Sequence, residues 1–389
     1  MHAVKLFALA AAMASCGGTQ TTQDGGPQDA SLDSSRDAAD GGCPSGQSSC
    51  GGKCMNVATD NANCGGCGLT CAACVKGRCT TTIATPALAP WAIAVDSKNV
   101  YWTSLGSCAS DGGVPTGNIA SAPITGGPPV TLVTAQGSPS AIAVDTQSIY
   151  WVNKSDCSGN GSVMKAGLDG SGLTTLAGNQ NQAQYIALDG ANVYWTTADG
   201  VLSIPIGGVA DGGAPTTLAS MQGASAGVAV EGKTVLWAQS GSRYDVNSVP
   251  VGGGSTRKLT PACGVGVACA GVAGLAADAD NVYWSPLVAG TYPTYNVVAM
   301  PVGGGALNTL AGLQGIAADI TSDGKNVYWA NYGMFMSLGQ DVFEVPVTGG
   351  TPTTLASSQA YPRGIAVDAT SVYWANSGSG GGIMKVTPK

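Results

Sequence analysis

Short apolar runs and polar turns repeat along the chain from Pro90 to its end, with a period of about 45 residues. Each repeat opens with an apolar run that contains Ala and ends in an acidic residue; soon afterwards an aromatic residue or Leu precedes a Trp. A variable loop, a short strand, a Gly-Gly turn and a Thr-Leu strand follow. The seven Trp residues are Trp102, Trp151, Trp195, Trp237, Trp284, Trp329 and Trp374. Four short strands per repeat, separated by Gly-rich turns, predict an all-β fold, a seven-bladed β-propeller.

The two ends of the repeat region complement each other. The seventh copy stops at Lys389 after three strands, and an extra strand-like run from Thr80 to Ala84 precedes the first copy. We predict that this run supplies the missing outer strand of the last blade, which closes the ring and removes its exposed edges. The propeller domain is therefore expected to span residues 80–389.

The Ile-Ala-Val-Asp runs and the Tyr-Trp pairs resemble the YWTD propellers of low-density-lipoprotein-receptor-type proteins, and more loosely the NHL propellers. The resemblance covers about 310 residues and implies the propeller fold. The family's Thr-Asp is missing after every Trp, although Asn or Gln stands at the Asp position in four repeats (Asn153, Gln239, Asn331 and Asn376). Receptor propellers usually have fewer blades than the seven counted here, and their ligands are not carried over to this chain.

The N-terminus reads as an export signal. One Lys precedes an apolar run from Leu6 to Met13, which is too short to cross a bilayer and suits the core of a signal peptide at residues 1–15. Met13-Ala14-Ser15-Cys16 resembles a bacterial lipobox, which implies that Cys16 is lipidated and becomes the new N-terminus. The alternative is an ordinary secretory signal followed by a chance Cys.

The stretch 16–42 is polar and acidic and is predicted to be a disordered tether. We expect the protein to be exported and lipid-anchored to the cell envelope, at the outer membrane, because Gly17 rather than Asp follows Cys16. Residues 43–79 form a small module that is too short to build a core without covalent links. Its eight cysteines are Cys43, Cys50, Cys54, Cys64, Cys67, Cys71, Cys74 and Cys79.

An exported module of this kind favours disulfides over the alternative, a zinc or iron–sulfur site. The module is similar to the cysteine-rich repeat of plant stigma-specific secreted proteins, which implies no known chemistry. Cys108 and Cys157 stand at the same offset from the Trp of neighbouring blades, so they are predicted to form a loop–loop disulfide. Cys263 and Cys269 bracket a small loop and are also predicted to be disulfide-bonded.

An acidic residue follows the first apolar run of every repeat. The seven are Asp96, Asp145, Asp189, Glu231, Asp278, Asp319 and Asp368. They could form an acidic ring that holds Ca²⁺ at one channel mouth, the only cofactor that we consider. The favoured interpretation is that each acid caps its hairpin turn by accepting backbone N–H bonds, since every blade needs that turn.

The loops after the second and fourth strands of each blade lie on one face, and they are long and irregular. Such loops on a rigid scaffold are where binding sites usually lie. Tyr and Arg, which are favoured at recognition sites, gather there. The candidate ligand-binding residues are Arg243, Tyr244, Tyr292, Tyr295, Tyr332, Phe335 and Arg363. The alternative is that these side chains pack among themselves.

Composition narrows the function. The net charge is −7 and no basic cluster occurs, which argues against nucleic acid or anionic lipid as a partner. The single histidine is His2, within the presumed signal peptide, so His-based catalysis is not expected. We predict a non-catalytic binding or scaffold module, tethered to the membrane, with a protein or glycan ligand. The alternatives are an exported metal-assisted propeller enzyme of the lactonase or lyase type and a purely structural surface protein.

Overall fold

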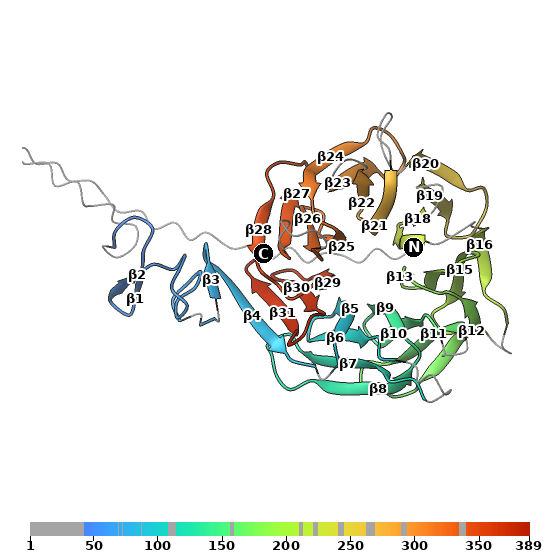
Figure 1. The fold of residues 1–389 in the computed structure, drawn as a ribbon, viewed down its shortest axis with the longest axis horizontal. Helices are drawn as coiled ribbons and strands as arrows, with labels where there is room; N and C mark the ends of the chain where they lie inside the picture. Colours follow the sequence, from blue (N-terminus) through green and yellow to red (C-terminus); the bar gives the residue numbers. More distant parts are fainter. Residues whose placement is uncertain are drawn as a thin grey trace, which may run out of the picture.

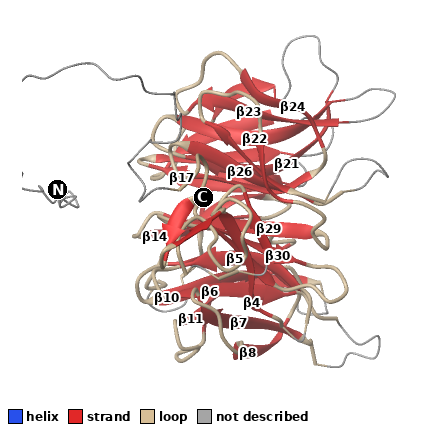
Figure 2. Cartoon of the chain, turned by 90° about the vertical axis from the view of Figure 1, so that its left-hand side faces the viewer, coloured by secondary structure: helices blue, strands red, loops and turns tan. Residues whose placement is uncertain are grey.

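The structure is a computed structural model. It describes residues 43–389 except 69, 72, 87, 108–113, 156–158, 210–212, 221–224, 240–244, 262–268, 289–293 and 334–339. Figure 1 shows a closed ring of small sheets, and Figure 2 shows the same sheets from the side. Every regular element in these residues is a β-strand, and none of them forms a helix that is long and apolar enough to span a membrane. The prediction of an all-β, seven-bladed propeller is confirmed.

Six blades are four-stranded antiparallel sheets and the seventh has a fifth strand at its outer edge; in every blade the first strand lies nearest the axis of the ring (Figure 1). The first three blades consist of β5 (Pro90–Val95), β6 (Asn99–Ser104), β7 (Gly117–Pro123) and β8 (Val130–Gln136); β9 (Pro139–Val144), β10 (Ser148–Asn153), β11 (Asn160–Gly167) and β12 (Thr174–Asn181); and β13 (Ile186–Leu188), β14 (Asn192–Thr196), β15 (Gly200–Pro205) and β16 (Thr216–Ser220).

The next three blades consist of β17 (Ser225–Glu231), β18 (Thr234–Gln239), β19 (Asp245–Pro250) and β20 (Arg257–Pro261); β21 (Cys269–Ala277), β22 (Asn281–Val288), β23 (Thr294–Pro301) and β24 (Asn308–Gln314); and β25 (Ala317–Ser322), β26 (Asn326–Asn331), β27 (Val342–Pro346) and β28 (Thr353–Ala356). The seventh blade contains β29 (Pro362–Val367), β30 (Val372–Asn376) and β31 (Ile383–Thr387).

The outer strand of the seventh blade comes from the N-terminal side of the propeller. Strand β4 (Arg78–Ala84) pairs antiparallel with β31, with Thr82 opposite Met384 and Thr80 opposite Val386. On its other edge β4 pairs with β3 (Ala73–Val75), so the seventh sheet has five strands. The first and last parts of the propeller are therefore joined within one sheet, at the position where the repeat count leaves a strand missing.

The aromatic pair of each repeat forms the contact between neighbouring blades. Trp102 lies in one apolar cluster with Tyr373 of the preceding blade, and Trp151 lies in the next cluster with Tyr101. Six of the seven repeat Trp side chains are fully buried, and Trp237 is 3% exposed. Because the Trp of one sheet packs against its neighbour's aromatic residue, the repeated pair stabilises the ring rather than a ligand site.

A buried Gln also ties neighbouring blades together. The Gln180 side-chain carbonyl accepts the indole N–H of Trp195 at 2.9 Å, and Gln136 does the same for Trp151. Gln136 also accepts an N–H of Asn153 at 3.0 Å, and Gln359 accepts from both Trp374 and Asn376. Asn at the family's Asp position thus makes a cross-blade bond in two repeats.

The cysteine-rich module contains the hairpin of β1 (Ser48–Cys50) and β2 (Lys53–Met55). Three disulfides link Cys43 to Cys54, Cys50 to Cys67 and Cys64 to Cys74. We expected all eight cysteines in disulfides, but Cys71 and Cys79 are thiols in this structure. The reason is local: Cys74, the cross-strand neighbour of Cys79, bonds to Cys64 instead.

The remaining cysteine predictions concern parts of the chain outside the described residues. Cys16, Cys108, Cys157 and Cys263 are not described, and neither is the side chain of Cys269, which begins β21. The lipid anchor and the loop–loop disulfide therefore stay predictions.

Candidate binding site at the channel mouth

The hairpin acids hold the turn between the first two strands of a blade. In the first blade, one Asp96 oxygen accepts the backbone N–H groups of Lys98 and Asn99 at 2.7 Å each, and the other accepts the Tyr101 hydroxyl at 2.9 Å. The same three bonds recur at Asp145, Asp189, Asp278, Asp323 and Asp368. These carboxylates are used as turn caps, in agreement with the favoured interpretation.

The fourth blade shows that the acid and the Tyr belong together. Leu236 replaces the Tyr of the repeat there, and the acid becomes Glu231, which pairs with Thr234 at the end of the hairpin. In the other blades, desolvation and the bond to the carboxylate raise the pKa of the Tyr, to about 12 for Tyr101 and Tyr150. The Tyr-Asp pair is thus a structural unit of the blade.

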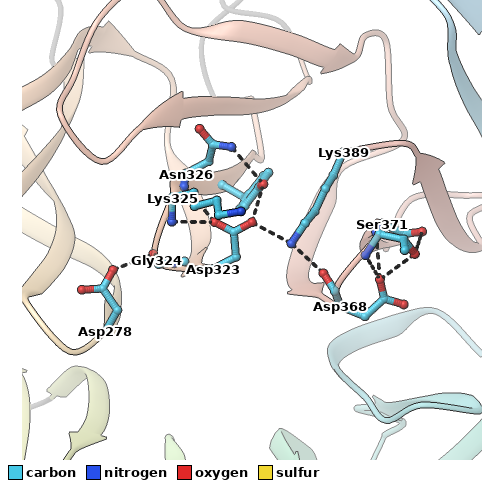
Figure 3. A network of polar contacts seen from close by, with 11 residues as sticks. Asp278, Asp323, Gly324, Lys325, Asn326, Asp368, Ser371 and Lys389 are labelled. Atoms are coloured by element: carbon cyan, nitrogen blue, oxygen red, sulfur yellow. Dashed lines mark hydrogen bonds and ion pairs between the residues drawn. The ribbon is translucent and has the colours of Figure 1, made fainter. Parts of the chain in front are cut away.

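The C-terminal Lys joins two of these turns (Figure 3). Lys389 Nζ lies 2.6 Å from Asp323 Oδ2 and donates to the Asp368 carbonyl oxygen, also at 2.6 Å. Burial opposes ionisation of Asp323, but the bonds from Lys389, Asn326, Lys325 and Tyr328 lower its pKa to about 2. This network fastens the sixth blade to the seventh on the hairpin face.

One predicted acid has a different place. Asp319 was expected to cap the hairpin of the sixth blade, but Asp323 does so, because the strand reads Ile320-Thr321-Ser322-Asp323 and Ile320 pairs with Trp329. Asp319 therefore lies inside the ring, where its two oxygens accept the backbone N–H groups of Ile320 (2.9 Å) and Ile365 (3.1 Å). Desolvation raises its pKa to about 6.

All seven innermost strands contribute residues to a central cavity of about 230 Å³. The residues at the position of Asp319 in the other blades are Ala92, Ala141, Tyr185, Gly227, Gly274 and Gly364. Five of these six are small because the inner strands crowd: a Cβ on Gly227 would lie 2.5 Å from Leu275 Cβ. Asp319 and Tyr185 are the large polar side chains of this layer. Desolvation, together with the charge of Asp319, raises the pKa of Tyr185 to about 12.

Arg363 lies where this channel opens on the long-loop face. Its guanidinium carbon is 3.6 Å from the ring centre of Trp91 and 4.0 Å from that of Tyr332. Tyr361 extends the cluster, with its ring centre 5.3 Å from that of Tyr332. Trp91, Tyr332 and Arg363 also line a second cavity of about 430 Å³, whose other walls include Leu88 and Leu105.

The structure thus brings together Tyr332 and Arg363 of the predicted ligand-binding residues. Tyr295 lies on β23 and lines neither cavity, while Arg243, Tyr244, Tyr292 and Phe335 lie outside the described residues. Trp91 and Tyr361 were missed. Trp91 had a signal, since it is the eighth Trp and the only one that does not occupy the Trp position of a repeat.

The predicted ring of acids does not converge on one ion site. In the described part of the chain, only Cys64, Cys71 and Cys74 place three candidate ligand atoms within 4.8 Å of one another. Two of these sulfur atoms form a disulfide, so the thiolates that a metal ion needs are not present there. Among the described residues, Asp319 is the one carboxylate that lines the central cavity.

No protein-family model and no curated protein matches the chain. Among solved structures, it is similar to the WD40 propeller domain of Doa1, at 12% identity and a TM-score of 0.57, over 79% of this chain and 95% of that one. It is also similar to the extracellular domain of a hybrid two component system from B. thetaiotaomicron, at 8% identity and a TM-score of 0.57, and spans 39% of that chain.

A Nidogen/Laminin complex matches at 16% identity and a TM-score of 0.40, over 74% of this chain and 85% of that one. At such low identities, the likeness to the WD40 domain of Doa1 and to the extracellular domain from B. thetaiotaomicron shows the fold alone. The chain is an all-β, seven-bladed propeller with a disulfide-rich N-terminal segment.

Proposed function

We propose that this protein is an exported, lipid-anchored, non-catalytic binding module that takes its ligand at the long-loop mouth of the propeller channel. The observation that carries the proposal is the Arg363 guanidinium held between Trp91 and Tyr332, at the junction of two cavities. Aromatic and Arg side chains are enriched at binding hot spots, and a pre-formed concave site on a rigid scaffold favours recognition.

The export part of the proposal is supported by the cysteines. Three disulfides within residues 43–74 are typical of an oxidising compartment. The lipobox-like Met13-Ala14-Ser15-Cys16 supplies the proposed anchor, and residues 17–42 supply a polar tether between the membrane and the module.

The non-catalytic part is supported by the chemistry at the mouth. Among the described residues lining the two cavities, Asp319 is the only acid, and the chain has no histidine beyond His2. A general acid–base pair or a base-activated nucleophile needs a second titratable group within hydrogen-bond reach. Tyr185 lines the same cavity as Asp319, but the oxygens of Asp319 accept the backbone N–H groups of Ile320 and Ile365 instead of the Tyr185 hydroxyl. Binding through Arg363 and the aromatic rings needs no such group.

Photo-crosslinking in intact cells tests the proposal. A photoreactive amino acid is placed at Ser107, which is exposed and lines the mouth cavity, or at Gln147, which is exposed in a turn on the opposite face. We expect discrete high-mass adducts from position 107 and none from position 147. Adducts from position 147 alone, or from neither position, would show that the mouth is not the binding site.

A further inference from the structure

The faces of the Arg363 guanidinium are both covered. Two aromatic ring centres lie 3.6 Å and 4.0 Å from the same guanidinium carbon. Rings at these distances would collide if they lay on one side of the guanidinium plane, so Trp91 and Tyr332 lie on opposite sides. The stacking fixes the plane of the cation, and its N–H groups, which lie in that plane, remain the only part able to take a polar partner.

No described residue satisfies these N–H groups. Arg78 pairs with Glu344, Lys258 with Asp245 and Lys389 with Asp323, but the Arg363 side chain has no ion pair or hydrogen bond to any described residue. Its Nε is buried without a partner. A buried N–H of a cation without an acceptor is costly, and a carboxylate is the acceptor that fits the planar fork best.

The cavity beside Arg363 suits an apolar group next to that carboxylate. Its walls include Leu88, Ala89 and Leu105, and the hydroxyl residues Ser107, Thr116 and Ser377 stand among them. The nearest acid along the channel, Asp319, is turned to the backbone N–H of Ile365, two residues beyond Arg363 on β29. A ligand anion therefore meets a cation at the mouth and an acid deeper in the channel.

We infer that the mouth binds an organic carboxylate, with its anionic group paired to the N–H edge of Arg363 and an apolar group against Leu88 and Leu105. The inference rests on the proposed function and adds the chemical class of the ligand. The charge order along the channel gives the ligand a direction: the carboxylate stays at the mouth because Asp319 repels an anion that enters further.

Two matched small molecules test the inference with the full-length lipoprotein in detergent. N-acetyl-leucine carries a carboxylate and an apolar side chain, and N-acetyl-leucinamide is the same molecule with a neutral amide. Saturation-transfer NMR titrations measure both affinities, because this method detects weak ligands of large particles. We expect the acid to bind at least about tenfold more tightly than the amide, since a charge-assisted fork is lost with the amide.

Variants assign the preference to one side chain. Arg363→Gln should remove the difference between acid and amide, and Arg363→Lys should keep part of it, because the charge remains without the planar fork. Arg257→Gln, which removes an exposed Arg from β20, should leave both affinities unchanged. Circular dichroism checks that each variant is folded, and the wild-type comparison of acid with amide stands without any variant.

Equal binding of acid and amide by the wild-type protein would overturn the inference, and so would the absence of binding by both. Neither result touches the crosslinking from Ser107, so a failure of the ligand class is distinguished from a failure of the binding site. Loss of the acid preference in Arg257→Gln as well as in Arg363→Gln would show that net charge, not the mouth, produces the preference.

Discussion

The pKa of Asp319 makes a pH-dependent prediction about stability. Desolvation raises it from 3.8 to about 6 in the native state, so the fold favours the protonated acid. The contribution of Asp319 to the free energy of unfolding is therefore most favourable below its unfolded-state pKa. This contribution is lost as the pH rises through the native-state pKa. The cost of ionising Asp319 in the fold, worked from the two pKa values, is about 3 kcal/mol.

Asp319→Asn should remove this cost, because Asn has nearly the same size, stays neutral and can still accept the N–H of Ile365. We expect the variant to unfold about 5 °C above wild type at pH 8 and at the same temperature as wild type at pH 4. The assay is thermal unfolding followed by circular dichroism in steps from pH 4 to pH 8, with the disulfides intact.

The control is Asp368→Asn. Partial burial opposes ionisation of Asp368, but four hydrogen bonds outweigh it and lower the pKa, so the ionised form stabilises the fold above the unfolded-state pKa. That variant should be less stable than wild type at pH 8, opposite to Asp319→Asn. If Asp319→Asn gives no gain at pH 8, or the same gain at pH 4, the channel does not desolvate Asp319 as described.

Four further predictions follow from the same structure. Gln180→Met should lower the free energy of unfolding in urea by about 1–3 kcal/mol, because the buried Trp195 N–H loses its acceptor. The control Gln147→Leu, at an exposed position, should change it by less than about 0.5 kcal/mol. Equal effects of the two variants would contradict the cross-blade role of Gln180. Lys389→Gln should lower the free energy of unfolding by about 1–3 kcal/mol at pH 7, and by less in acid, where Asp323 becomes protonated. Urea unfolding at pH 7 and in acid measures both values, and a loss that does not depend on pH would refute the ion pair. Cys16→Ser should release the protein into the soluble fraction or leave it unprocessed, and a variant that is cleaved and still membrane-bound would rule out the lipid anchor. Non-reducing peptide mapping should find Cys108 linked to Cys157, and a link of either to Cys263 would contradict the pairing.

The fold followed from the sequence because its signals are local and repeated. Six of the seven blades have an Asp-capped turn and a Tyr-Trp pair within a few residues, and the fourth has Glu231 and Leu236-Trp237 at these positions, so the pattern revealed the number and order of blades. The capping acid of the sixth blade was predicted wrongly, because Ala317-Ala318-Asp319 resembles the apolar run and acid that begin the other repeats. The distance to the Trp identifies the capping acid correctly: the acid stands six residues before the Trp in the other blades, as Asp323 does before Trp329.

The candidate site was only partly predictable. Strand order predicted which face of the propeller carries the long loops, and this placed Tyr332 and Arg363 together on that face. Trp91 joins them because blades one and seven are neighbours in the closed ring, a contact between distant parts of the chain. Tyr361 joins them because it stands two residues before Arg363 and contacts Tyr332 of the sixth blade. That Cys71 and Cys79 lie outside the three disulfides was not predictable either, since disulfide pairing depends on which sulfur atoms the folded module brings within reach.

The most direct test of the central claim combines the crosslinker at position 107 with changes at Arg363. Cells would carry this crosslinker in the wild-type background, with Arg363→Gln, or with the control Arg257→Gln. A ligand held at the channel mouth through Arg363 should give adducts in the wild-type and Arg257→Gln proteins and lose most of them in Arg363→Gln. Adducts of equal intensity in all three, from folded protein at equal abundance, would contradict the claim that Arg363 anchors the ligand.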